Sequence, residues 1–153
     1  MPLVVADATT LADAFIDGKL TPDAAIQTEA PGGVWNEAAE QGTTGRIIRY
    51  AFQRGATAQG AGAFGPLTIV NDELIYEVLL YLITMVGEND RMEDLAAGAT
   101  RIKQLLHRSS GAVTGGQVLW CRYLIPHKEY VPDGDQYYPE RGGYYEITVQ
   151  ATS

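Results

Sequence analysis

The chain has 153 residues, of which 46% are hydrophobic and 20% charged, as in an ordinary globular protein with one sizeable core. The net charge of -8 argues against binding to phosphate backbones or anionic membranes, because both need clustered Lys and Arg. The single cysteine, Cys121, excludes an intrachain disulfide and fits a reducing compartment. The longest apolar run, Val78 to Val86, is too short to span a bilayer.

The first third of the chain predicts a short helix and then a strand. Apolar residues at helical spacing predict a helix from Asp7 to Ile16, which Thr9 or Thr10 would cap and Gly18 would end. Strict alternation of apolar and polar residues predicts a half-buried strand from Arg46 to Gln53.

The rest of the chain predicts three more strands and one long helix. A strand from Glu73 to Val86 is apolar on both faces, so we expect a helix to cover one face and a neighbouring subunit the other. Helical spacing of apolar residues predicts the long helix from Asn89 to His107. Two strands follow, Gln117 to Tyr130, broken by Pro126, and Tyr144 to Thr152.

This order predicts an α+β fold: a mainly antiparallel sheet with a long helix packed on one face and a short N-terminal helix. We expect a single domain over residues 1–153. The strand–helix–strand step from Glu73 to Tyr130 is expected to be a parallel crossover.

A Gly/Ala-rich loop over residues 54–67 contains no carboxylate, His or Cys, which argues against a catalytic loop. A loop of this length in a small domain is usually functional or disordered, and its small residues let backbone approach a partner closely. We therefore expect a partner-binding surface, with Phe64 as an apolar anchor. The candidate interface residues are Arg54, Gln59, Phe64 and Leu67. The alternative is a hairpin tip without a partner.

Two other groups of side chains are candidates for chemistry. The best candidate for a metal site contains His127, Asp133, Asp135 and Glu140. Its spacing matches no calcium loop, and a polar surface turn explains it better. Cys121 with His107 or His127 would be a nucleophile and a base, but a Cys in an apolar strand is typical of a small buried hydrophobe. No catalytic residue, metal or cofactor is therefore predicted, and the chain is not expected to be an enzyme.

The segment Gly32 to Thr43 resembles the "GGVYNGVAPQGT" segment of the tail terminator (tail completion) proteins of long-tailed bacteriophages. Further segments resemble the same family in the same order. They are the strand Ile47 to Gln53, the long strand Leu74 to Val86, the helix Ala96 to Arg108, the strand start Gly116 to Arg122 and the ending Gly142 to Gln150.

The resemblance implies a structural protein of the virion. It would form a homohexameric ring that caps the tail tube and joins it to the head connector, near the neck of the tail. Its partners would be copies of itself, the tail tube protein and the connector proteins, with assembly in the host cytoplasm. DNA would only pass through the lumen, where acidic side chains would repel it within a Debye length of about 10 Å. The alternatives are another neck or tail part, either a head–tail adaptor or a tube protein, and then an enzyme of unknown type.

Overall fold

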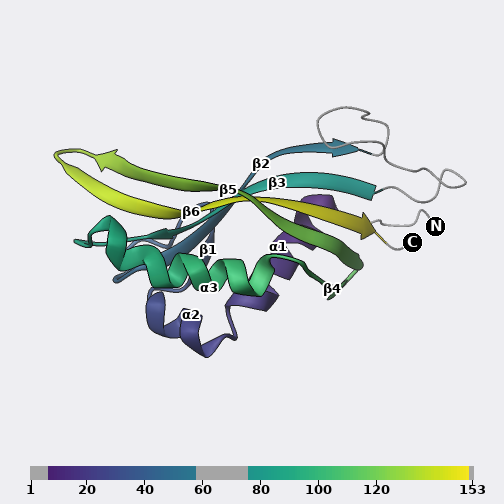
Figure 1. Cartoon of the computed structure of the whole chain (residues 1–153), viewed down its shortest axis with the longest axis horizontal. Helices are drawn as coiled ribbons and strands as arrows, with labels where there is room; N and C mark the ends of the chain where they lie inside the picture. Colours follow the sequence, from purple (N-terminus) through teal and green to yellow (C-terminus); the bar gives the residue numbers. More distant parts are fainter. Residues whose placement is uncertain (1–6, 58–75, 152–153) are drawn as a thin grey trace, which may run out of the picture.

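The computed structural model describes residues 7–57 and 76–151 of the chain. In order along the chain, its elements are α1 (Ala8–Leu20), α2 (Ala24–Glu29), β1 (Val34–Asn36), β2 (Ile47–Thr57), β3 (Tyr76–Val86), the 3-10 helix η1 (Met92–Leu95), α3 (Ala96–Leu106), β4 (Ser109–Val113), β5 (Gly116–Asp133) and β6 (Gln136–Ala151). The six strands form one curled sheet in the order β1-β2-β3-β6-β5-β4 (Figure 1). The β1–β2 pair is parallel and the other four pairs are antiparallel.

The predicted α+β fold with a long helix is therefore wrong. Strands make up 50% of the described residues, and the longest helical run, η1 followed by α3, has 15 residues. The helix begins later than predicted because Asn89 has a φ of +58°, outside helical geometry, and it ends at Leu106 because His107 is extended. The sheet is mixed because β1 pairs parallel with β2.

Strands β5 and β6 are much longer than predicted, and they form one continuous hairpin. β5 is not broken at Pro126, because β4 begins at Ser109 opposite Cys121 and does not reach Pro126. At Pro126, β5 therefore pairs with β6 alone and is an edge strand among the described residues, which is where a sheet tolerates a proline. The hairpin turns at Gly134, whose φ of +63° suits the tight turn between Asp133 and Gln136. The predicted parallel relation of the strands around α3 holds for β3 and β5, with β6 between them.

The core lies between one face of the sheet and the helices, which Figure 1 shows together on that side. Leu79, Tyr81, Ile83 and Met85 of β3 form the central row, and all are at most 2% exposed. The capping residue of α1 is Asp7, whose side chain accepts from the Thr9 N–H, and the helix continues through Gly18 to Leu20. The Tyr81 hydroxyl donates to Asp13 Oδ1 at 2.7 Å, which fixes α1 against β3.

Salt bridges and side-chain hydrogen bonds join the remaining elements. Arg101 of α3 binds Asp23, the cap of α2, at 2.7 Å. Arg46 binds Asp90 at 2.9 Å and so fastens the start of β2 to the turn before η1. This arrangement leaves the opposite face of the sheet without a helix among the described residues.

Candidate assembly interface

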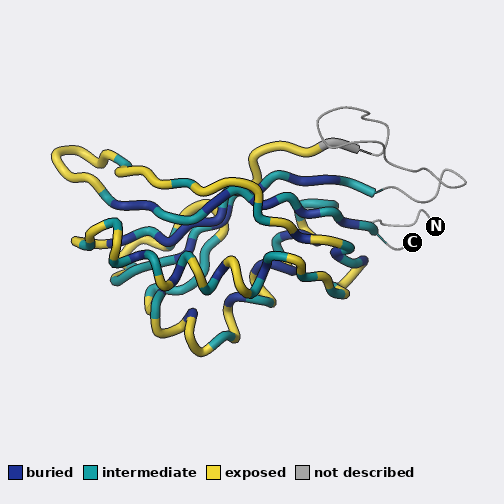
Figure 2. The backbone as a smooth tube through the Cα atoms, in the orientation of Figure 1, coloured by how far each residue is buried: buried dark blue, intermediate teal, exposed yellow. Residues whose placement is uncertain are grey.

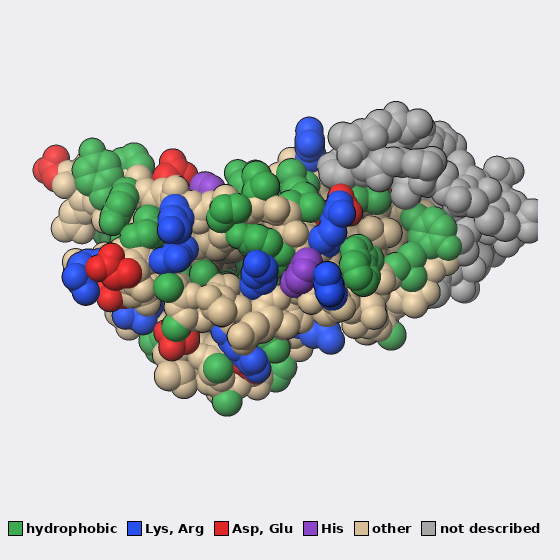
Figure 3. Space-filling model, in the orientation of Figure 1, with side chains coloured by type: hydrophobic (Ala, Val, Ile, Leu, Met, Phe, Trp, Pro, Cys, Tyr) green, Lys and Arg blue, Asp and Glu red, His purple; other side chains and the backbone are tan. Residues whose placement is uncertain are grey.

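The face of the sheet opposite the helices, called the outer face here, carries exposed apolar side chains. Leu80 and Leu82 of β3 point to this face and are half-buried. Trp120 and Ile125 of β5 are 43% and 56% exposed, and Tyr144 lies between the two strands on β6. Hydrophobic side chains are visible along the upper margin of the molecule in Figure 3. An exposed apolar group of this kind is typical of a protein–protein interface.

A buried polar cluster occupies the other end of the outer face. The carboxylate of Glu140, only 2% exposed, accepts two bonds from Arg49 at 3.0 and 3.1 Å and one from the Thr84 hydroxyl at 3.0 Å. His127 Nε2 lies 3.6 Å from Glu140 and 3.5 Å from Glu129. The cluster contains residues from β2, β3, β5 and β6, so it fixes the order of these strands.

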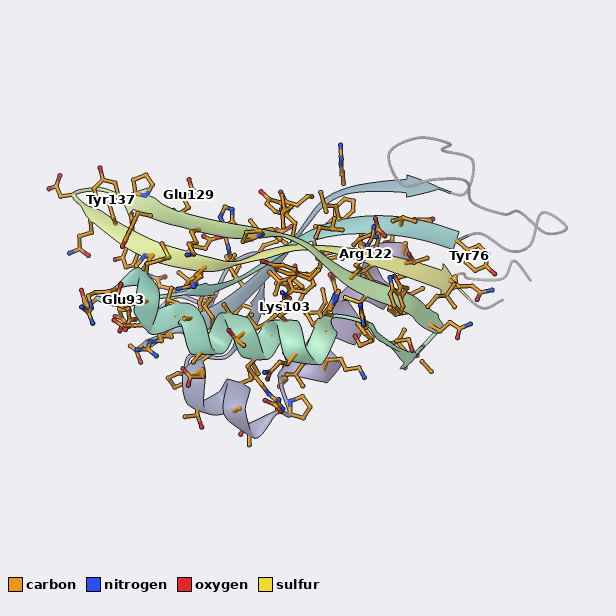
Figure 4. The ribbon with its side chains drawn as sticks, viewed as in Figure 1. Tyr76, Glu93, Lys103, Arg122, Glu129 and Tyr137 are labelled. Atoms are coloured by element: carbon orange, nitrogen blue, oxygen red, sulfur yellow. The ribbon has the colours of Figure 1, made fainter. Side chains whose placement is uncertain are left out.

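The end of the β5–β6 hairpin projects beyond the sheet. This arm, defined as Tyr130–Pro139, begins where β3 ends, because Val86 pairs with Glu140. Figure 2 shows most of the arm as exposed. Tyr130 and Tyr137 are 52% and 67% exposed, and Figure 4 places Tyr137 on the arm. Large exposed aromatic side chains on a projecting ribbon favour contact with another protein.

A cleft of about 180 Å³ lies between α3 and the base of the arm. Lys103 of α3, Lys128 of β5 and Arg141 of β6 line it, over a floor that includes Ala96, Ala99 and Pro126. Lys103 Nζ lies 4.3 Å from the centre of the Tyr123 ring, and Arg141 donates to the Met92 carbonyl at 3.3 Å. Within residues 7–57 and 76–151, none of the three cations forms a salt bridge.

Of the predicted interface residues, the structure describes Arg54 alone. It lies in β2 opposite Leu80 and is exposed. The other three, Gln59, Phe64 and Leu67, lie outside the described residues, so the loop interface stays a prediction.

The candidate catalytic residues point in different directions. Cys121 is fully buried on the core side of β5, and burial raises the pKa of its thiol to about 12. His107 Nδ1 accepts the Tyr123 N–H at 3.0 Å, and His127 lies on the outer face. Arg122 also points to the outer face and binds Glu146 at 3.3 Å.

The candidate metal ligands are divided between the two ends of the arm. His127 and Glu140 lie at its base, whereas Asp133 and Asp135 flank its turn. No group of three or more His, Cys, Asp or Glu side chains suited to a metal ion occurs in the described part of the chain. Two acidic residues before η1 have defined partners: Glu88 accepts from the Gly45 N–H, and Asp90 accepts from Arg46.

Sequence reasoning missed the cleft and the Glu140 cluster. The sequence contained one signal for the cleft, the Asp-Gly turn at Asp133 and Gly134. Counting residue pairs outward from that turn places Lys128 opposite Arg141, as the structure has them. The position of Lys103 depends on how α3 packs, which no local pattern predicts.

Comparisons with known proteins give a likeness at the level of the fold. No family model matches the chain, and no curated protein matches it. A chain of the solved "Virion of native gene transfer agent (GTA) particle" has the same fold, with a TM-score of 0.66 and 14% sequence identity. The match covers 94% of this chain and 100% of that one. In the described part of this chain, no helix has the length and apolar character needed to cross a membrane.

Proposed function

We propose that this protein is a structural component of a phage-like virion. The observation that carries the proposal is the likeness to the virion chain, which extends over the whole of that chain and nearly all of this one. The outer face and the arm support it, because both present apolar side chains that a partner would bury.

Within the virion, we propose the role of a tail terminator: a subunit of a homohexameric ring that caps the tail tube and joins it to the head connector. The sequence segments that resemble the tail terminator family, and follow one another in the same order, support the role. The structural likeness to a virion chain agrees with a protein of the virion. The ring would be structural rather than enzymatic, since the Cys121 thiol is buried and away from the outer face. The net charge of -8 suits a lumen through which DNA passes without binding.

Electron microscopy of the purified protein, alone and mixed with tail tubes of its own phage, tests this role. A terminator forms single rings and places one at an end of each tube. A tube protein would instead form long open polymers, and a head–tail adaptor would bind the connector but leave the tubes uncapped. Either of these results would reject the terminator role and keep the broader virion assignment. If the protein forms no rings and no polymers and binds no part of the virion, both the terminator role and the virion assignment are contradicted.

A further inference from the structure

The cleft beside α3 is a basic site in an acidic protein. Lys103, Lys128 and Arg141 meet there without a salt bridge to any described residue, although the chain has 19 acidic side chains and 11 basic ones. Gathered cations without counterions repel one another, and an anionic group bound between them would remove that repulsion. The cleft therefore has the chemistry to bind carboxylates.

The tip of the arm has the complementary chemistry. Asp133 and Asp135 lie on either side of Gly134, are exposed and form no salt bridge with a described residue. Tyr137 near the tip and Tyr130 at the base of the same arm expose apolar surface, and the cleft lining includes the small side chains of Ala96 and Ala99. Tip and cleft thus match in charge and in apolar character.

We propose that the cleft of one subunit binds the acidic arm tip of a second copy of this chain. The arm is a paired two-stranded ribbon, and Gly134 lies six positions beyond Lys128, a span of about 20 Å. A subunit's own tip therefore cannot reach its own cleft. Because tip and cleft are different surfaces, the contact is heterologous, and repeating it generates a closed ring or an open filament. This inference rests on the proposed ring and specifies how its subunits join.

Nucleic acid is the other polyanion that such a cleft can attract. The observations favour the arm tip, because three cations are few for a phosphate backbone and the net charge of -8 opposes it. The cleft also has an apolar floor that suits a tyrosine-bearing protein segment.

Charge reversal tests the contact. The cleft variant carries Lys103→Glu and Lys128→Glu. The tip variant carries Asp133→Lys and Asp135→Lys. All four side chains are exposed, so both variants should have the melting temperature of the wild type. Sedimentation velocity should show that each variant alone loses the wild-type assembly. An equimolar mixture should regain it, because each reversed surface then meets a complementary one and a six-membered ring can alternate. Arg108→Glu is the control, since Arg108 is exposed, forms no salt bridge with a described residue and lies outside the cleft.

Three results would overturn the contact: wild-type assembly by either variant alone, a mixture that stays unassembled, or loss of assembly in the Arg108→Glu control. Binding of a short DNA duplex by the wild type but not by the cleft variant, with assembly unchanged, would identify the cleft as a phosphate site instead. Failure of the ring proposal looks different. The wild type would then form open chains that both variants lose and the mixture restores, so the contact would stand without the ring.

Discussion

At Cys121, burial decides whether the thiol can react. The side chain is fully buried on the core side of β5, and burial raises its pKa to about 12, so the reactive thiolate is scarce at ordinary pH. We expect a thiol-specific reagent at about pH 8 to label the folded protein only at the rate at which the protein unfolds. Labelling in denaturant should be fast and stoichiometric. Equally fast labelling of the folded chain would show that Cys121 is accessible.

The Arg49–Glu140 pair neutralises the charge of a buried carboxylate in a cluster that four strands share. Arg49→Met should lower the free energy of unfolding by about 1.5–3 kcal/mol, the usual contribution of hydrogen bonds to a charged group. The double variant Arg49→Met with Glu140→Leu should recover much of the loss, because no uncompensated charge remains. Chemical denaturation measures both. If the free energy of unfolding of Arg49→Met equals that of the wild type, the Arg49 guanidinium does not stabilise the buried Glu140 carboxylate.

At the scale of elements, Gly142 determines how closely β6 approaches β3. A Cβ at Gly142 would lie 2.0 Å from the carbonyl oxygen of Ile83, so Gly142→Ala must displace backbone. We expect a loss of about 1–3 kcal/mol or more in the free energy of unfolding. Gly18→Ala is the matched control: nothing lies within 4 Å of a Cβ there, and within α1 the change should add about 0.5–1 kcal/mol. Two variants of equal stability would contradict this account of the β3–β6 contact.

The two faces of β3 give a second element-scale prediction. Leu79 is 2% exposed in the core, whereas Leu80, next along the strand, is half-buried on the outer face. Leu79→Ala should cost about 2–5 kcal/mol of folding free energy, and Leu80→Ala distinctly less. Thermal unfolding of the unassembled protein compares them directly. A greater loss of folding free energy in Leu80→Ala than in Leu79→Ala would contradict the account, because it would mean that the core lies on the outer face of the sheet.

Strand periodicity predicted four of the six strands, β2, β3, β5 and β6, and placed the starts of β2 and β5 within one residue, because alternation along a strand reflects one covered face. It did not predict how far β5 and β6 extend. Pro126 was predicted to break β5, and the last strand was predicted to begin only at Tyr144, but in the folded chain Pro126 pairs with Gly143 and Pro132 with Tyr137 across one hairpin. Helix α1 shows the same limitation, since Gly18 is a common stop signal and here lies inside a helix that packing maintains. The cleft depends on contacts between α3 and the hairpin, so only the three-dimensional structure could show it.

At the scale of the whole molecule, the two faces of the sheet differ. The helices cover one face of the sheet and form the core with it, while the outer face and the arm leave apolar and charged groups exposed. An acidic net charge limits unwanted association with nucleic acid, and the basic cleft supplies a local attraction for an acidic segment. The proposed ring would use this division, because each of its subunits would present two different contact surfaces.

The central claim, that this chain assembles into a closed ring, is tested most directly by native mass spectrometry of the purified protein over a series of concentrations. The account predicts a single dominant species of six subunits that grows from monomer without intermediate sizes accumulating, since ring closure adds a contact that open forms lack. A broad ladder of sizes that lengthens with concentration, or a monomer at every concentration, would contradict it.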